Sequence, residues 1–209
     1  NVYSVNSQES MRQTEIIQPD NCKFIGQIFD TYILAQQDDV FYIVDQHAAQ
    51  ERVRYEIFLN QMAKKALNVQ QFLIPEIFEF SASKTVVLKS RLEIFKDLGF
   101  SVEEFGANTF RLTSYPALLG HNVNFIEIIE TLISFLAEEK NADVEQITEK
   151  IIKTACTSSV KAGDKLQDKQ AVELMKDLFA CAMPWTCPHG RPTVYVLTQK
   201  DLEKFFKRI

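Results

Sequence analysis

The hydrophobic period of the chain changes abruptly at Asp45. The residues before it, Val40 to Val44, are all apolar, which is typical of a strand in the middle of a covered sheet. From His47 to Ala66 the chain has neither glycine nor proline, and apolar residues such as Val53 and Ile57 recur at helical spacing. Asp45 stands where a side-chain cap for this helix is expected. The sequence therefore predicts a buried strand that leads directly into a long helix.

Other strand and helix patterns surround this pair. Two short β-rich segments precede it between residues 23 and 35, and a mixed αβ section runs from about residue 70 to 145. Helical patterns then return, followed by a strand at Thr193 to Leu197. This order predicts an α+β fold in which early and late segments build one discontinuous subdomain, a small sheet plus helices, around an inserted αβ unit. Residues 1–20, rich in Gln, Ser, Asn and Glu, are expected to be a flexible linker.

Charge and composition limit the function classes. The net charge is -5, whereas a protein that binds DNA tightly on its own usually has a basic excess. No apolar run reaches the roughly 18 residues that a membrane helix needs, and the polar first residues give no signal peptide. We therefore expect no membrane partner and a cytoplasmic location. The cysteines form no CxxC pair and are expected to be reduced thiols, some of them metal ligands: Cys22, Cys156, Cys181 and Cys187.

The start of the long helix carries a group of metal-ligand side chains. His47 and Glu51 are four residues apart, which places both on one helix face, and Asp45 at the strand end can turn toward the same place. The alternative is a capping aspartate, a hydrogen-bonded histidine and a surface glutamate. Glu56 points to the other side of the helix and is better placed to pair with Arg52, so we expect it to be structural.

A second group lies near the end of the sequence. Cys187 and His189 are two apart in a proline-flanked turn, where Gly190 permits a backbone angle that other residues resist. A thiolate and an imidazole together with carboxylates favour a zinc-like ion. The alternative is a structural turn with a buried thiol. Cys156 is a further candidate ligand, and a small cysteine in the core is the alternative for it.

Together these segments resemble the MutL family of DNA mismatch repair proteins that nick DNA. Asp45-Gln46-His47-Ala48 with Glu51 and Glu56 resembles the endonuclease signature of that family, and Cys187 to Pro192 resembles its late C-P-H-G-R-P motif at every position. Phe206-Lys207-Arg208 is similar to its terminal F-x-R element. Ala155-Cys156 matches the start of its A-C-[KR] motif, with Thr157 in place of the usual basic residue. The resemblance covers about residues 22 to 209.

The resemblance implies the C-terminal endonuclease and dimerisation region of a bacterial, nicking-type member. A homodimeric dimerisation/endonuclease subdomain would comprise residues 21–65 and 150–209, and an inserted regulatory subdomain residues 66–149. Zinc would be structural or regulatory, and manganese would support cleavage. Arg191 could clamp a phosphate, with a loop-orienting ion pair as the equal alternative. The implied metal ligands are Asp45, His47, Glu51, Cys156, Cys187 and His189, and the implied catalytic residues are Asp45, His47, Glu51 and Arg191.

Further partners follow from the same resemblance. Gln70 to Pro75 is similar to the Q-x-x-[LI]-x-P peptide that docks on the replication sliding clamp. Leu73 and Pro75 would enter an apolar pocket of the clamp and Gln70 would hydrogen-bond at its edge, the alternative being an apolar lead-in to a strand. Weakly bound DNA, the N-terminal ATPase region and a mismatch-recognition protein are the other implied partners, with a nucleoid-associated location. The chain has no G-x-x-x-x-G-K-[ST], so we do not expect this region to bind ATP.

Two rival functions remain open from the sequence. One is a non-catalytic dimerisation scaffold in which zinc only stabilises the fold. The other is an unrelated zinc hydrolase, which would ordinarily show a local signature such as H-E-x-x-H, and none is present. The nuclease hypothesis requires that the imidazole of His47 and the sulfur of Cys187 meet around common or adjacent ions.

Overall fold

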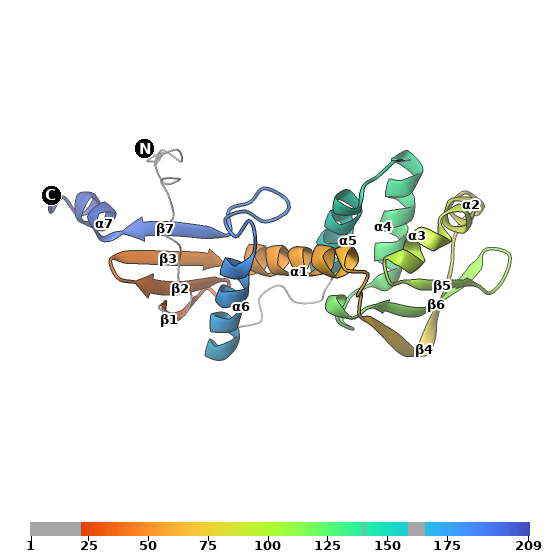
Figure 1. The fold of residues 1–209 in the computed structure, drawn as a ribbon, viewed down its shortest axis with the longest axis horizontal. Helices are drawn as coiled ribbons and strands as arrows, with labels where there is room; N and C mark the ends of the chain where they lie inside the picture. Colours follow the sequence, from red (N-terminus) through yellow and green to blue (C-terminus); the bar gives the residue numbers. More distant parts are fainter. Residues whose placement is uncertain (1–21, 140, 159–165) are drawn as a thin grey trace. The chain divides into compact units, whose positions relative to one another are not determined.

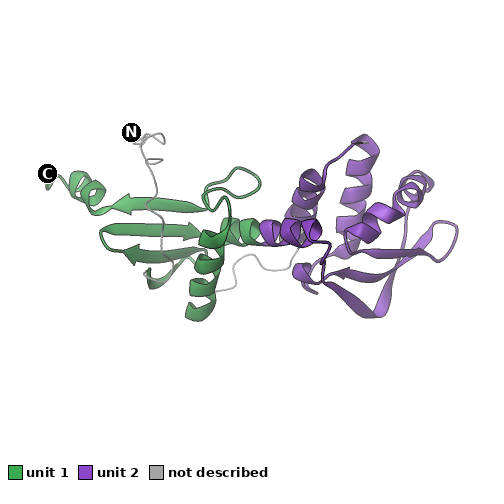
Figure 2. Ribbon diagram, in the orientation of Figure 1, with its two compact units in different colours: residues 1–53, 163–209 green, residues 54–162 purple. Residues whose placement is uncertain are grey.

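The computed structural model describes residues 22–139, 141–158 and 166–209, which form two compact units (Figures 1 and 2). Unit 1 comprises residues 1–53 and 163–209, and unit 2 comprises residues 54–162. The first boundary falls inside helix α1 (Gln46–Ala63), earlier than the predicted subdomain border after residue 65. The roles predicted for the subdomains stay predictions, and the predicted linker, residues 1–20, lies outside the described residues.

Unit 1 contains a four-stranded antiparallel sheet that joins distant parts of the chain. Its strands β1 (Lys23–Ile28), β2 (Tyr32–Gln37) and β3 (Val40–Asp45) follow one another, and β7 (Val194–Thr198) pairs with β3 to give the order β1-β2-β3-β7 (Figure 1). The strand predicted at Val40 to Val44 therefore lies in the interior of a sheet. Early and late segments build this sheet together, and the α+β class is confirmed.

Only one face of this sheet is covered by the described part of the chain. Side chains on that face pack with α1 and with α6 (Asp168–Ala180) into a core of Ile33, Ala35, Tyr42, Val44, Ala49, Val53, Ala171, Met175, Leu178 and Val194. On the other face Ile43 is half-buried and Tyr195, its cross-strand neighbour, is 46% exposed. The expectation that β3 is covered on both sides is wrong for the described residues, because its alternate apolar side chains have no intramolecular layer over them.

Unit 2 is a three-stranded antiparallel sheet with helices on one face. The strand order is β4-β6-β5, where β4 is Val69–Glu79, β5 is Ser101–Glu104 and β6 is Thr109–Pro116. Helix α4 (Phe125–Glu138) turns its apolar stripe into a core that includes Phe110, Leu112, Ile128, Ile129 and Leu132. The remaining helical elements are α2 (Ala82–Ser90), α3 (Leu92–Asp97), the short 3-10 helix Ala117–Leu119 and α5 (Val144–Ser158).

In unit 1 the sequence after β7 forms the short helix α7 (Gln199–Phe205). Among the described residues, none of the helices is both long enough and apolar enough to cross a bilayer.

Candidate metal centre

The start of α1 positions the candidate ligands His47 and Glu51 on one side of the helix. Asp45 ends β3 and caps the helix, since its Oδ1 accepts the N–H of Ala48 at 2.9 Å. His47 Nε2 lies 3.1 Å from Oε1 of Glu51, which is one helical turn further along α1, as the spacing of four residues predicts. Asp45 thus has the capping role that the sequence left as an alternative, and its role as a ligand stays a prediction.

The C-P-H-G-R-P loop is a tight turn fastened to α1. The N–H of Cys187 donates to the carbonyl of Arg191 at 2.8 Å, and the N–H of Gly190 donates to the carbonyl of Cys187 at 2.9 Å. Gly190 has φ +78°, a conformation that costs other residues energy. From the helix, the buried side chain of Arg52 donates through Nε to the carbonyl of Thr186 at 2.6 Å. The loop is therefore held over the start of α1.

Helix and loop bring Glu51, Cys187 and His189 together. One ligand atom from each lies within 4.8 Å of the others. His189 Nδ1 is 3.2 Å from Glu51 Oε2 and 3.9 Å from Cys187 Sγ. Glu51 and Cys187 are buried, so an ion here would be largely withdrawn from water. Sulfur, nitrogen and carboxylate oxygen at this spacing fit an ion of the zinc type.

The negative charge of Glu51 is stabilised by hydrogen bonds from its neighbours. Arg191 Nη2 lies 2.8 Å from both Oε1 and Oε2 of Glu51. Burial by itself raises the pKa of Glu51, but hydrogen bonds from His47, Arg191 and His189 outweigh it and lower the pKa to about 2. The hydrogen bond to Glu51 in turn raises the pKa of His47, against the opposing effect of burial. The carboxylate of Glu51 is therefore ionised at neutral pH and available to a cation.

Not every predicted site residue joins this group. The backbone of Cys156 belongs to α5 in unit 2, and its side chain lies outside the described part, so its role as a ligand stays a prediction. His47 meets the group through its contact with Glu51. Arg191 makes the ion pair that was its alternative role. Arg52 was not predicted to serve the site, since its acceptor is a backbone carbonyl far along the chain that no local spacing reveals.

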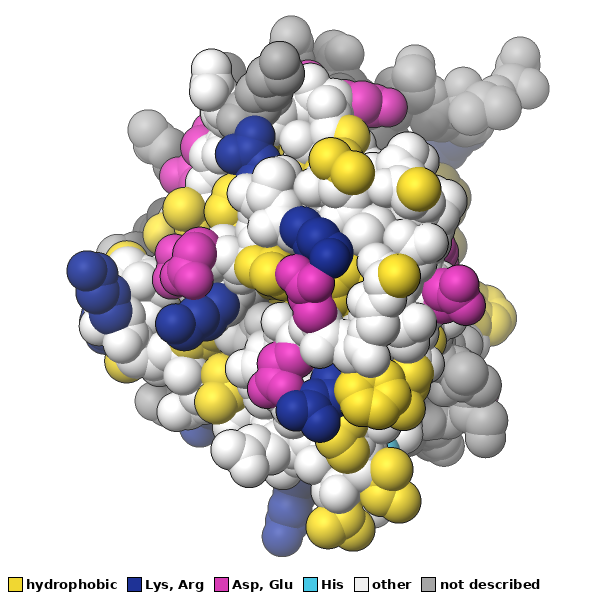
Figure 3. Space-filling view, turned by 90° about the vertical axis from the view of Figure 1, so that its right-hand side faces the viewer, with side chains coloured by type: hydrophobic (Ala, Val, Ile, Leu, Met, Phe, Trp, Pro, Cys, Tyr) yellow, Lys and Arg dark blue, Asp and Glu magenta, His cyan; other side chains and the backbone are white. Residues whose placement is uncertain are grey.

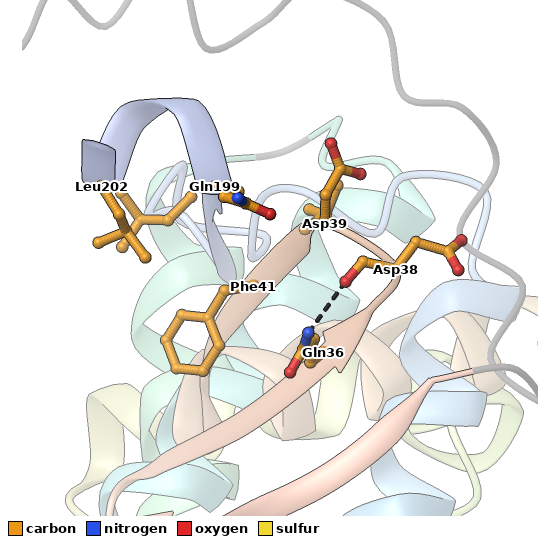
Figure 4. A pocket seen from close by; sticks show the side chains of 8 residues that line it. Gln36, Asp38, Asp39, Phe41, Gln199 and Leu202 are labelled. Atoms are coloured by element: carbon orange, nitrogen blue, oxygen red, sulfur yellow. Dashed lines mark hydrogen bonds between the residues drawn. The ribbon is translucent and has the colours of Figure 1, made fainter. Parts of the chain in front are cut away.

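A separate pocket of about 320 Å³ lies at the opposite end of β3 and β7. Phe41 and Leu202 point to the same side of it, whereas the carboxylates of Asp38 and Asp39 point away (Figure 4). Gln36 Nε2 donates to the carbonyl of Asp38 at 2.9 Å. Among the described residues, the group of three ligand-type side chains is at the other end of these strands. We therefore assign no metal chemistry to this pocket.

Comparison with known proteins places the chain in a family. The sequence model of the MutL C terminal dimerisation domain matches residues 25–166. The chain belongs to this family. The resemblance to the MutL family is thereby confirmed.

Curated relatives of this MutL domain match 90% or more of the chain. The DNA mismatch repair protein MutL of Endomicrobium trichonymphae is 52% identical over 188 residues, which cover 90% of this chain and 31% of that protein. The protein of the same name from Clostridium botulinum (strain Loch Maree / Type A3) is 37% identical over 210 residues, covering 100% of this chain and 31% of its own length. The MutL of Ligilactobacillus salivarius is 35% identical over 188 residues, 90% of this chain and 28% of that protein. The chain thus spans about a third of the length of these relatives.

Proposed function

We propose that this MutL dimerisation domain is also a metal-dependent endonuclease that nicks one strand of DNA. The observation that carries the proposal is the meeting of Glu51, Cys187 and His189 in unit 1. A bound ion would lower the pKa of a water molecule and polarise a phosphoryl oxygen. In this proposal zinc is structural or regulatory and manganese supports cleavage.

The residues around the three ligands suit a phosphodiester substrate. The side chain of Arg191 is 54% exposed, so its guanidinium can reach a phosphate oxygen from the edge of the site. His47 is 35% exposed and touches Glu51, so it is reachable from solvent and held in a fixed orientation. A guanidinium and an imidazole at the edge of the site can bind and orient the negatively charged phosphate backbone of DNA.

The mixed charges on the surface of unit 2 support the proposal that this region alone binds DNA only weakly. On the face shown in Figure 3, basic and acidic side chains lie interspersed. Lys84 pairs with Glu130 at 2.9 Å, and Arg111 pairs with Glu103 at 2.6 Å. With a net charge of -5, affinity for DNA would depend on other parts of the protein or on partners. We propose the N-terminal ATPase region and a mismatch-recognition protein for these roles, with ATP bound outside this chain.

A non-catalytic scaffold is the second candidate function, because the same three ligands would also hold a structural zinc. Asp45→Asn separates the two. Asparagine keeps an oxygen that accepts the Ala48 N–H, so the helix cap should persist while the negative charge is lost. We expect nicking of supercoiled DNA in Mn²⁺, with clamp and ATPase region supplied, to fall by at least about 100-fold, the scale of losing an essential catalytic group, with melting temperature and zinc content unchanged.

The matched control for that experiment is Asp143→Asn. Asp143 caps α5 in the same way, since its Oδ1 accepts the N–H of Gln146 at 2.8 Å. This variant should nick DNA at the wild-type rate. Equal nicking by wild type and Asp45→Asn would remove Asp45 from the catalytic residues, and zinc binding by a wild type that never nicks would favour the scaffold.

We further propose that unit 1 dimerises through the uncovered face of its sheet. Alternate residues on neighbouring strands line up across this face, with Leu34 opposite Ile43 and Ile43 opposite Tyr195. An antiparallel sheet face of apolar side chains needs a covering layer, and a second copy of the same face supplies one by two-fold symmetry. The apolar residues of this face are Ile25, Ile28, Tyr32, Leu34, Phe41, Ile43, Tyr195 and Leu197.

The sliding clamp is the partner we propose for a bulge in β4. The register between β4 and β6 shifts between Gln71 and Glu76, inside the segment predicted to bind the clamp. Leu73 is 100% exposed and Ile74 79% exposed. Phe72 turns the other way and packs on Tyr115, with ring centroids 4.7 Å apart. The bulge thus presents Leu73 outward on a base that Phe72 anchors.

Leu73→Ala should weaken clamp binding about 30-fold, the loss expected for one apolar anchor residue. Surface plasmon resonance with purified clamp measures the affinity. Because Leu73 is fully exposed, the free energy of unfolding should change by less than about 0.5 kcal/mol. Ile77→Ala, at a position 58% exposed on the same strand but outside the motif, is the control. Equal affinities of the Leu73 variant and wild type would contradict the proposal.

A further inference from the structure

The carboxylate of Glu51 is fully occupied by its neighbours. Its Oε1 lies 3.1 Å from His47 Nε2 and 2.8 Å from Arg191 Nη2. Its Oε2 lies 3.2 Å from His189 Nδ1 and 2.8 Å from the same arginine nitrogen. An ionised carboxylate offers about four lone-pair sites. An ion that binds Glu51 must therefore displace at least one of these contacts.

Arg191 is the neighbour that has to give way. The histidines have ring nitrogens that bind metal ions once they are deprotonated. A guanidinium stays protonated, has no lone pair to offer and repels a cation. The side chain of Arg191 is 54% exposed, against 3% for Glu51, so returning it to water costs little.

We propose that Arg191 and the metal ion exchange with each other at Glu51. Arg191 neutralises the buried carboxylate in the metal-free protein and turns toward solvent when the ion takes its place. An unpaired buried carboxylate would be strongly unfavourable, so the exchange keeps Glu51 ionised and in position in both states. The freed guanidinium then stands at the edge of the site, able to bind a phosphate in its bidentate mode. This inference rests on the metal site proposed above.

Arg191→Gln tests the exchange through metal affinity. Glutamine keeps amide donors but removes the charge that competes with the ion. Competition with a chromophoric chelator should show that the variant binds Zn²⁺ at least about tenfold more tightly than wild type, because the ion no longer displaces a charge-assisted hydrogen bond. Without metal the variant should melt below wild type, and saturating Zn²⁺ should narrow the difference in Tm.

Arg111→Gln is the matched control, since it removes the exposed ion pair of an arginine with Glu103 in unit 2 and should leave Zn²⁺ affinity unchanged. Cys187→Ser reports on the metal site itself. One outcome would contradict the exchange and leave the metal site supported. In that outcome wild type binds Zn²⁺, Cys187→Ser binds it poorly, and Arg191→Gln binds it no more tightly than wild type. Equal failure of wild type and Cys187→Ser to bind Zn²⁺ overturns both.

A second variant, Arg191→Lys, tests the exchange if the Arg191→Gln protein does not fold. Arg191→Lys keeps the positive charge but replaces the guanidinium fork with a single ammonium, which pairs less well with a carboxylate. Its Zn²⁺ affinity should rise above that of wild type by a smaller factor than with glutamine. An affinity equal to or below that of wild type contradicts the exchange.

Discussion

Glu51→Gln should lower the free energy of unfolding by about 3 kcal/mol and abolish Zn²⁺ binding. The variant leaves His47, His189 and Arg191 around a neutral amide in a buried site, and losing one partner of a buried ion pair costs about 3–5 kcal/mol. Lowering the pKa of Glu51 from 4.5 to about 2 corresponds to a similar free energy, since each unit is about 1.4 kcal/mol. Urea unfolding of the metal-free protein and chelator competition measure the two effects.

The pH dependence of this loss gives a second measurement. The pKa of Glu51 is lower in the folded state than in the unfolded state, so its contribution to stability is full above pH 4.5 and is lost as pH falls toward about 2. The difference between wild type and Glu51→Gln should therefore shrink below pH 4.5. Because Glu51 raises the pKa of His47, the difference should also decrease as pH rises above 6.5 and through that raised pKa, so it should be largest between these two limits.

Glu103→Gln is the control for Glu51→Gln. It removes a carboxylate that is 47% exposed and pairs with Arg111, and exposed pairs contribute at most about 1 kcal/mol. Equal effects of the two substitutions on stability would show that the contacts of Glu51 carry no special weight.

Ile43→Asp should convert the dimer to a monomer. Ile43 lies on the central strand β3, between Leu34 and Tyr195 on the uncovered sheet face. In a two-fold contact each copy would bury an unpaired aspartate, which costs several kcal/mol, so the dimer dissociation constant should rise by at least about 1000-fold. Sedimentation equilibrium over a range of protein concentrations measures it, and circular dichroism checks that the monomer is folded.

Phe29→Asp is the control for the interface. Phe29 is 83% exposed in the turn after β1, and its φ of 52° suits aspartate better than an aromatic residue. This variant should remain dimeric. A folded Ile43→Asp protein that sediments as a dimer would place the interface elsewhere.

Local chemistry explains which features could be predicted. The cap by Asp45, the i,i+4 contact of His47 with Glu51 and the interior strand at Val40 to Val44 depend on neighbouring residues, whose patterns the sequence displays. The binding of Arg191 to both oxygens of Glu51 depends on two segments meeting in space, so the sequence left its role open.

Two differences have physical causes. An apolar strand looks the same whether its second face is covered by its own chain or by another molecule, so β3 was expected to be covered on both sides. The residues from Ser83 to Leu98 include neither glycine nor proline, and this pattern predicts one continuous helix. The structure has two helices, α2 and α3, because Arg91, with φ -127°, leaves the helix. Phe95 and Leu98 after this break are buried, and that burial is a tertiary effect.

The hydrogen bond from Arg52 Nε to the backbone carbonyl of Thr186 depends on the side chain at position 52 but not on the side chain at position 186. Because every amino acid has a backbone carbonyl oxygen, substitution of the residue at position 186 would leave the acceptor of this hydrogen bond in place. Position 52 is more restricted, because only arginine has a planar guanidinium whose N–H donors point in fixed directions and stay charged. Related sequences should therefore drift at 186 and stay fixed at 52, although neither position is a candidate ligand.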